Sequence, residues 1–168
     1  MSQRPTDADA QPAHRSAQEQ ARFMAALTDM FEKRIRFNEV LGLRVESIAP
    51  PAPSLSFDMK PELVGHFLYG RLHGGVISAV LDATAGLALM AGIADRHPAD
   101  DADQVLQRFS RMGTIDLRVD FLRQGVGRHF VASAEVTRLG GRVGSTQMRL
   151  VNEQGLLIAT GAASYILA

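Results

Sequence analysis

The sequence predicts an α+β domain in which a curled antiparallel sheet of about six strands wraps around one apolar helix. The first observation is a segment, residues 73–92, that is apolar around its whole circumference and holds a single formal charge, Asp82. Such a helix is expected to be enclosed. The second is a set of segments of alternating or β-branched character separated by short turns, as in antiparallel strands. A sheet with one apolar face must bury it, and residues 73–92 are its natural partner.

Composition and charge narrow the function classes. The chain has 168 residues and balances 18 Lys and Arg against 18 Asp and Glu, so no net field favours nucleic acid as a partner. It contains no cysteine, which excludes disulfides, thiolate chemistry and cysteine-based zinc sites. This fits a reducing compartment, and we expect a cytoplasmic protein. The sequence presents no cluster of metal ligands, so we expect neither a metal nor another cofactor.

The N-terminal part is expected to be helical and then to start the sheet. Residues 1–16 are polar, lack the apolar core of a signal peptide, and predict a disordered tail before a single domain, residues 17–168. Residues 17–36 have the apolar period of an amphipathic helix. Asn38 is a candidate N-cap of a short turn that stops at Gly42. Two strands with a Pro-rich connection and then a loop follow: residues 43–49, 54–60 and 61–72.

The apolar segment and its successor are interpreted as a core helix and a helical insertion. Residues 74–94 are long enough to span a bilayer, but they are rich in Gly and Ala and carry Asp82 at mid-length. We therefore expect a helix buried in the domain and no membrane insertion. Residues 94–112 predict a polar loop and a short helix that Asp100 or Asp101 caps.

The C-terminal part is expected to supply four consecutive strands, residues 114–123, 129–139, 142–152 and 156–167. Short turns predict a four-strand meander, which with the earlier hairpin makes about six strands. A helix wrapped in such a sheet is the hotdog architecture. Alternation in the first of these strands predicts four apolar residues on one face: Ile115, Leu117, Val119 and Phe121.

Two motifs resemble a known family. "LHGGVISAVLDATAGLAL" and "SRMGTIDLRVDFLRQG" are similar to the signatures of hotdog-fold acyl-CoA thioesterases of the PaaI-like family, most closely its bacterial YigI-type members. The resemblance covers roughly residues 20–168. It implies hydrolysis of an acyl-CoA thioester in active sites built across the interface of a homodimer or a dimer of dimers. His66 stands where relatives often have Asn, and Gln124 interrupts the Arg-Pro-Gly turn that is usual in the family.

The resemblance and the chemistry of thioester cleavage assign roles to the central motif. Asp82, nine residues after His73, is the candidate base or nucleophile, and Gly74 N–H at the helix start is the candidate oxyanion donor. Gly75 allows a ligand to approach the backbone closely. His73 either positions the carbonyl or orders the helix start. The alternative for Asp82 is a purely structural carboxylate that neighbouring groups satisfy by hydrogen bonds. The alternative for Gly74 and Gly75 is that they only make a tight turn into the helix.

The remaining candidates lie outside the helix. Thr114 is expected to hold the attacking water against Asp82, although its place in the alternation sets it opposite Ile115 and leaves its direction undecided. His66 is a candidate contact to the thioester carbonyl, with an exposed loop histidine as the alternative. Arg123 and Arg142 are candidate partners of the CoA phosphates.

The spacing within the helix predicts a shared site. Gly74 and Asp82 are eight residues apart, hence roughly 12 Å apart along a helix. A single carbonyl cannot lie within about 3 Å of both. A two-fold dimer with antiparallel central helices would bring Gly74 of one chain to Asp82 of the other. Two further classes remain open, a non-catalytic acyl-CoA-binding module and a hotdog hydratase or dehydratase.

Overall fold

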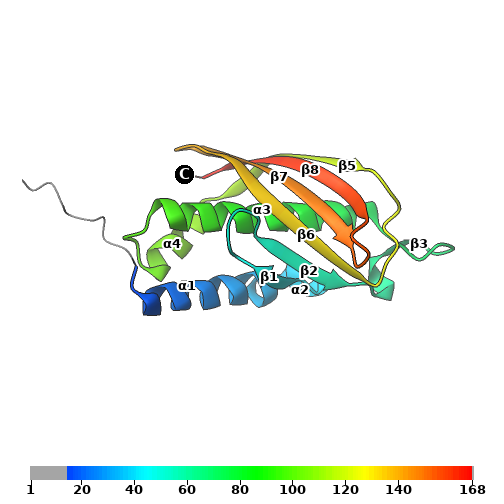
Figure 1. Cartoon of the computed structure of the whole chain (residues 1–168), viewed down its shortest axis with the longest axis horizontal. Coiled ribbons are helices and arrows are strands. Elements are labelled where there is room, and N and C mark those ends of the chain that lie inside the picture. The colour runs from blue at the N-terminus through cyan, green and yellow to red at the C-terminus, as the bar shows by residue number, and fades with distance from the viewer. Residues whose placement is uncertain (1–14, 168) are drawn as a thin grey trace, which may run out of the picture.

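The computed structural model describes residues 15–167, and its elements are shown in Figure 1. The helical elements are α1 (Ala17–Asp29), the π-helical η1 (Met30–Arg34), α2 (Arg36–Leu41), the 3-10 turn η2 (Pro61–Leu63), α3 (Gly74–Arg96) and α4 (Ala102–Phe109). The strands are β1 (Arg44–Ser47), β2 (Ser54–Asp58), β3 (Val64–His66), β4 (Arg71–Leu72), β5 (Gly113–Phe121), β6 (His129–Leu139), β7 (Val143–Asn152) and β8 (Leu157–Ile166).

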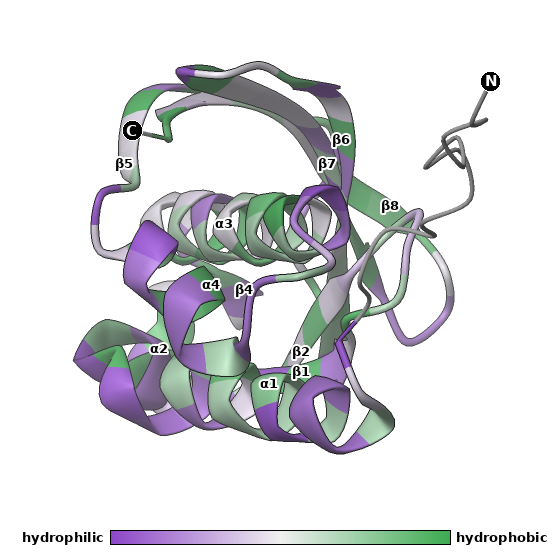
Figure 2. Cartoon of the chain, turned by 90° about the vertical axis from the view of Figure 1, so that its left-hand side faces the viewer, coloured by the Kyte–Doolittle hydropathy of each residue, from purple (hydrophilic) through white to green (hydrophobic). Residues whose placement is uncertain are grey.

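The predicted hotdog architecture is confirmed. Six antiparallel strands form one sheet that curls around α3, while α1, α2 and α4 cover the other side of that helix (Figure 2). α3 is long and apolar enough to cross a membrane by length and composition, but 72% of its most apolar window is buried within the domain. Its small residues allow close packing: a Cβ on Gly92 would already touch Leu139 and Val136. The helix is therefore the core of the domain, as its uniform apolar character predicts.

The connectivity of the sheet differs from the predicted meander of four. The strand order is β1-β2-β6-β7-β8-β5, so β5 pairs with β8 at the edge of the sheet and not with its successor β6. The connection 122–128 crosses the end of the sheet. It is held there because Leu122 and Arg123 donate to the carbonyl of Ile158, and Gly125 accepts from Leu72. A short connection was expected to make a hairpin, but these anchors replace the hydrogen bonds that a hairpin would supply.

The N-terminal helix is interrupted where one regular helix was expected. α1 ends at Asp29, the chain continues as a π turn, and α2 follows. Asn38 is not an N-cap: it lies buried inside α2, and its side-chain amide donates to the carbonyl of Phe31 at 3.0 Å. A π turn disturbs the helical hydrogen-bond ladder, and this amide satisfies a carbonyl within it. Gly42, with φ of 74°, ends α2 as predicted.

The boundary of the expected tail also shifts. Residues 1–14 lie outside the described residues, but Arg15 and Ser16 are part of the fold. Ser16 caps α1 by accepting from Glu19 N–H, and the guanidinium of Arg15 donates to the carbonyls of Ala94, His97 and Asp100. A cation at the end of a helix satisfies carbonyls that lack intrahelical partners. The domain therefore begins by residue 15.

Two further details concern the segments on either side of α3. Asp101, not Asp100, caps α4, in a capping box with Gln104. The expected loop before α3 contains a small hairpin, β3–β4, which projects from the body of the domain (Figure 1). The hairpin tip exposes three large apolar side chains, Phe67, Leu68 and Tyr69.

Candidate active site

The carboxylate of Asp82 lies half-buried on α3 and is held by two hydroxyl groups. Thr114 Oγ1 donates to Oδ1 of Asp82 at 3.0 Å, and the hydroxyl of Tyr165 donates to the same oxygen. The Tyr165 hydroxyl also lies 2.7 Å from the backbone carbonyl oxygen of Asp82. Within residues 15–167, Oδ2 accepts no hydrogen bond. Asp82 therefore has one fixed oxygen and one oxygen that is free to react or to bind water.

A β-bulge explains how Thr114 reaches Asp82. In the β5–β8 ladder Thr114 pairs with Tyr165 and Asp116 pairs with Ser164, so Ile115 is an extra residue on β5. The bulge shifts the alternation by one residue and turns Thr114 toward α3. Ile115 is consequently 59% exposed, and its expected place on the inner face with Leu117 is wrong. The direct contact also differs from the expected role of Thr114, because its hydroxyl binds the carboxylate itself.

Tyr165 is the site residue that sequence reasoning missed. It lies near the end of β8, 83 residues from Asp82, and is 5% exposed. Burial and the hydrogen bond to Asp82 raise the pKa of Tyr165, so the phenol keeps its proton and acts as a donor. The only signal in the sequence is a hydroxyl-bearing aromatic residue in an otherwise small and apolar final strand, which does not indicate its partner.

An apolar hollow of about 300 Å³ opens beside Asp82. Its floor is one face of α3, where Ala79, Ala83 and Gly86 are neighbours of Asp82 at helical spacing. Among the residues lining it Asp82 is the only charged one. The walls come from the N-terminal helices and from the segment around α4: Phe31, Ile35, Phe37, Asn38, Phe109 and Met112. This is a suitable shape and polarity for an acyl chain that ends at a carboxylate.

The start of α3 presents a free backbone donor. His73 is the N-cap, and its Nδ1 accepts from Gly75 N–H at 2.9 Å, so one expected role of His73, ordering the helix start, is seen directly. Gly74 N–H donates no hydrogen bond within the described part of the chain. A Cβ on Gly74 would lie 3.4 Å from the ring of Phe121, so this glycine sits beside the end of β5. The free N–H and the positive end of the helix together suit a developing oxyanion.

The two halves of the expected site are separated within one chain. Asp82 and Thr114 lie beside the start of β5, whereas Gly74 lies beside Phe121 at the end of the same strand. A different hollow borders Gly74 and is lined by two arginines, Arg123 and Arg71, of which Arg71 was not among the candidates from the sequence. One chain alone therefore does not place the oxyanion donor at the carboxylate.

The remaining candidates fall in different places. His66 lies in the β3–β4 hairpin and contacts the rings of Phe67 and Tyr69, and its Nδ1 is buried without a partner in residues 15–167. Arg123 donates to the carbonyl of Leu157, near the end of β5. Arg142 directly precedes β7. The first residues of β7 and β5 both pair with Ile166 of β8, so Arg142 lies level with the start of β5. The two arginines are therefore at opposite ends of the sheet and do not meet one ligand in a single chain.

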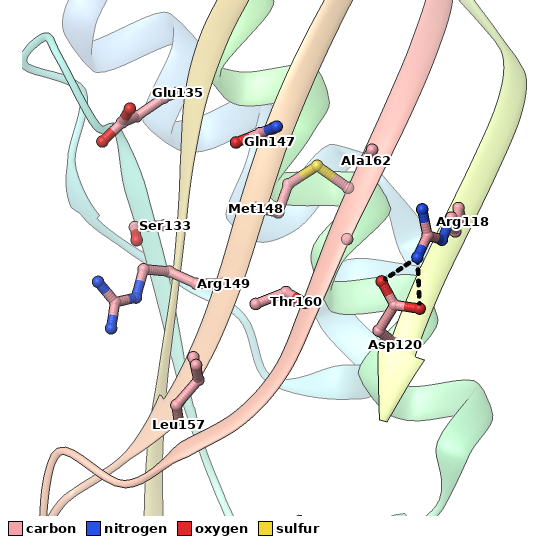
Figure 3. Close-up of a pocket in the computed structure, with 11 residues that line it drawn as sticks. Arg118, Asp120, Ser133, Glu135, Gln147, Met148, Arg149, Leu157, Thr160 and Ala162 are labelled. Carbon is pink, nitrogen blue, oxygen red and sulfur yellow. Dashed lines mark hydrogen bonds and ion pairs between the residues drawn. The ribbon is translucent and has the colours of Figure 1, made fainter. Parts of the chain in front are cut away.

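A separate hollow of about 520 Å³ lies on the outer face of the sheet (Figure 3). Outward-pointing polar residues of four strands line it, and Arg118 pairs with Asp120 across its edge. Neither Asp82 nor Gly74 borders it, so this surface is separate from the candidate active site.

Comparisons with known proteins agree with this geometry. Residues 69–159 match the Thioesterase superfamily. The medium/long-chain acyl-CoA thioesterases YigI of Salmonella typhimurium and Escherichia coli are 41% identical over 138 residues, which is 82% of this chain and 89% of theirs. A Shewanella oneidensis crystal structure related to the thioesterase superfamily has a TM-score of 0.83 at 36% identity, covering 91% of this chain and 100% of that one. Phenylacetic acid degradation protein PaaI from Thermus thermophilus has a TM-score of 0.61 at 25% identity, covering 79% and 99%. The hotdog fold, the carboxylate on its central helix and these relatives together establish that the chain belongs to the thioesterase superfamily and is a thioester hydrolase.

Proposed function

We propose that this protein hydrolyses medium- to long-chain acyl-CoA in two active sites, each shared between the subunits of a homodimer. The observation that carries the proposal is the free Oδ2 of Asp82 at the wall of an apolar hollow that can accept an acyl chain. The named activity of the YigI relatives supports the substrate class.

The chemistry needs a base or nucleophile and an oxyanion donor. In one route Asp82 removes a proton from water while the water oxygen bonds to the carbonyl carbon. In the other route the carboxylate of Asp82 attacks the carbonyl carbon itself, and water releases Asp82 in a second step. In both cases the carbon–sulfur bond breaks, CoA leaves as a thiolate that takes up a proton, and the acyl group leaves as a free acid. Gly74 N–H stabilises the negative oxygen, which is typically worth a factor of about 10²–10³ in rate.

Antiparallel pairing of β5 with its own copy would assemble the missing half of the site. β5 is an edge strand with an unpaired row of backbone groups, and it exposes Ile115 and Phe121. A two-fold axis near its middle places the partner's Phe121 beside Thr114. Within each chain, Gly74 lies beside Phe121 and Asp82 lies beside Thr114. The same axis therefore brings the partner's Gly74 to Asp82, which resolves the 12 Å separation estimated roughly from the helical rise.

The CoA part of the substrate would lie near the start of the partner's α3. Arg71 and Arg123 border the hollow that contains Gly74, and guanidinium groups bind phosphates in a bidentate way. Arg71 also lies over the ring of Tyr69, which holds its side chain at the hairpin. Arg142 remains a candidate only if the partner subunit brings it near the same phosphates.

A panel of acyl-CoA esters from hexanoyl to palmitoyl, assayed with a thiol reagent, tests the activity. We expect release of free CoA, highest for medium and long chains, and loss of about 10²–10⁴-fold in kcat for Asp82→Asn. Sedimentation is expected to give at least a dimer. Binding of these esters without CoA release would support the non-catalytic binding module instead. Formation or loss of a double bond without CoA release would indicate a hydratase or dehydratase.

A further inference from the structure

The Tyr165 hydroxyl is placed where it can control the orientation of Asp82. It contacts both the side-chain Oδ1 and the backbone carbonyl of the same residue, and so spans Asp82 from its main chain to its carboxylate. Thr114, which pairs with Tyr165 across the β5–β8 ladder, donates its hydroxyl to the same Oδ1. Two donors on one oxygen restrict rotation of the carboxylate and direct Oδ2 away from both hydroxyls.

Tyr165 is buried, and both hydrogen bonds that its hydroxyl donates go to Asp82. The Thr114 hydroxyl is its other polar neighbour, and their contact lowers the pKa of Tyr165 by less than burial and Asp82 raise it. Among the residues that line the hollow, Asp82 and Tyr165 are the only titratable ones, because Thr114 and Asn38 are neutral and the rest are apolar or glycine. Tyr165 keeps its proton near neutral pH because burial raises its pKa, which rules out a role as general base.

We propose that Tyr165 is a positioning residue: its hydroxyl, with that of Thr114, fixes Oδ1 of Asp82 so that Oδ2 faces the thioester or the attacking water. This rests on the proposed function, in which Asp82 is the reacting carboxylate. The effect belongs to orientation and acts through Asp82. Misplacement of a reacting group by about 1 Å can lower a rate by about 10²-fold.

The test is Tyr165→Phe, which keeps the ring and removes the donor. We expect kcat to fall about 10- to 100-fold while KM for palmitoyl-CoA changes less than about twofold. Thr146→Val is the matched control: it removes another buried hydroxyl, on β7, that contacts Met148 and not Asp82. This control should keep both kcat and KM.

A second variant keeps the proposal open to refutation if Tyr165→Phe folds poorly. Thr114→Val removes the other donor to Oδ1, and the two substitutions combined should be non-additive in kcat because both act on one oxygen. An Asp82→Asn variant that is inactive beside a Tyr165→Phe variant with the wild-type kcat would overturn the role of Tyr165 alone. Equal rates for Asp82→Asn and the wild type would instead overturn the proposed role of Asp82, and with it the positioning role.

Discussion

Enlarging residue 86 is expected to shorten the acyl chain that the enzyme accepts. Gly86 lies one turn beyond Asp82 on the floor of the apolar hollow, and a Cβ built on it would lie 3.9 Å from Cζ of Phe31. Alanine therefore fits without displacing a neighbour, whereas the isobutyl group of leucine extends into the space between α3 and Phe31. If the acyl chain runs through this space, Gly86→Leu excludes its distal part.

The size of the effect follows from the methylenes that lose their burial. Each buried methylene is worth about 0.8 kcal/mol, so excluding about two of them lowers kcat/KM for a long chain by about 1.6 kcal/mol, or roughly 15-fold. Hexanoyl-CoA, whose chain is long enough only to reach about as far as Gly86, should lose much less kcat/KM than palmitoyl-CoA. The assay is CoA release from hexanoyl-, decanoyl- and palmitoyl-CoA. Equal losses for all three chain lengths would refute the path of the chain past Gly86.

Gly86→Ala distinguishes a steric effect on the acyl chain from an effect of helix stability. Alanine in a helix interior is favoured over glycine by about 0.8–1 kcal/mol, so Tm should rise by about 2–4 °C. Gly92→Ala is the matched control, because Gly92 lies in the same helix but faces Leu139 on the sheet at 3.5 Å. Both alanine variants should raise Tm, and only Gly86→Ala should change the ratio of palmitoyl-CoA to hexanoyl-CoA hydrolysis. A change in that ratio for Gly92→Ala as well would attribute the effect to the stiffness of the helix.

The other predictions concern the ends of the fold and the hairpin. Arg15→Ala is expected to lower the free energy of unfolding by about 2 kcal/mol, and Tm by about 4–8 °C, because one carbonyl in the last turn of α3 and two just after the helix lose a charged donor. Thermal unfolding measures the change, and an unchanged Tm would contradict it. His66→Asn should keep kcat within about twofold and His66→Ala should lose about 10-fold, because an amide can replace the imidazole donor to a carbonyl. Wild-type rates for both His66 variants would assign His66 to packing of the hairpin.

The central helix was predictable because its chemistry is unusual. A single charge in a long apolar segment, a glycine pair and a histidine at its start have few structural explanations. The structure has Asp82 within α3, with His73, Gly74 and Gly75 at the start of that helix. The shape of the sheet could be predicted for a similar reason, since an enclosed helix needs strands around it. Such features can be predicted because the residues themselves require burial of the helix and strands that cover it.

The contacts around Asp82 could not be predicted in the same way. The bulge at Ile115 leaves the apolar alternation of β5 intact in the sequence, so no residue marks the point where Thr114 turns inward. Tyr165 and Thr114 come together at Asp82 because β5 pairs with β8, whereas the short connection 122–128 favoured a different pairing. The error in strand order and the missed tyrosine therefore have one cause: the connection is anchored by long-range hydrogen bonds that local sequence does not show.

The shared site leads to a prediction that a single-chain site could not satisfy. Asp82→Asn and Gly74→Pro should each abolish most activity, the first by removing the carboxylate and the second by removing the free N–H. Proline is tolerated as the first residue of a helix, and His73 already has the extended backbone that precedes proline.

Unfolding the two variants together and refolding them makes hybrids of about half the dimers. In a hybrid, one site carries both substitutions and the other carries neither, because each site takes Asp82 from one chain and Gly74 from the other. Activity should therefore return to about a quarter of wild type if the sites act independently. If both residues acted within one chain, every site in a hybrid would contain one substitution and the mixture would stay inactive. That result, with hybrids confirmed by native mass spectrometry, would refute the pairing of β5 with its copy and require the thioester to reach Asp82 without the N–H at the start of α3.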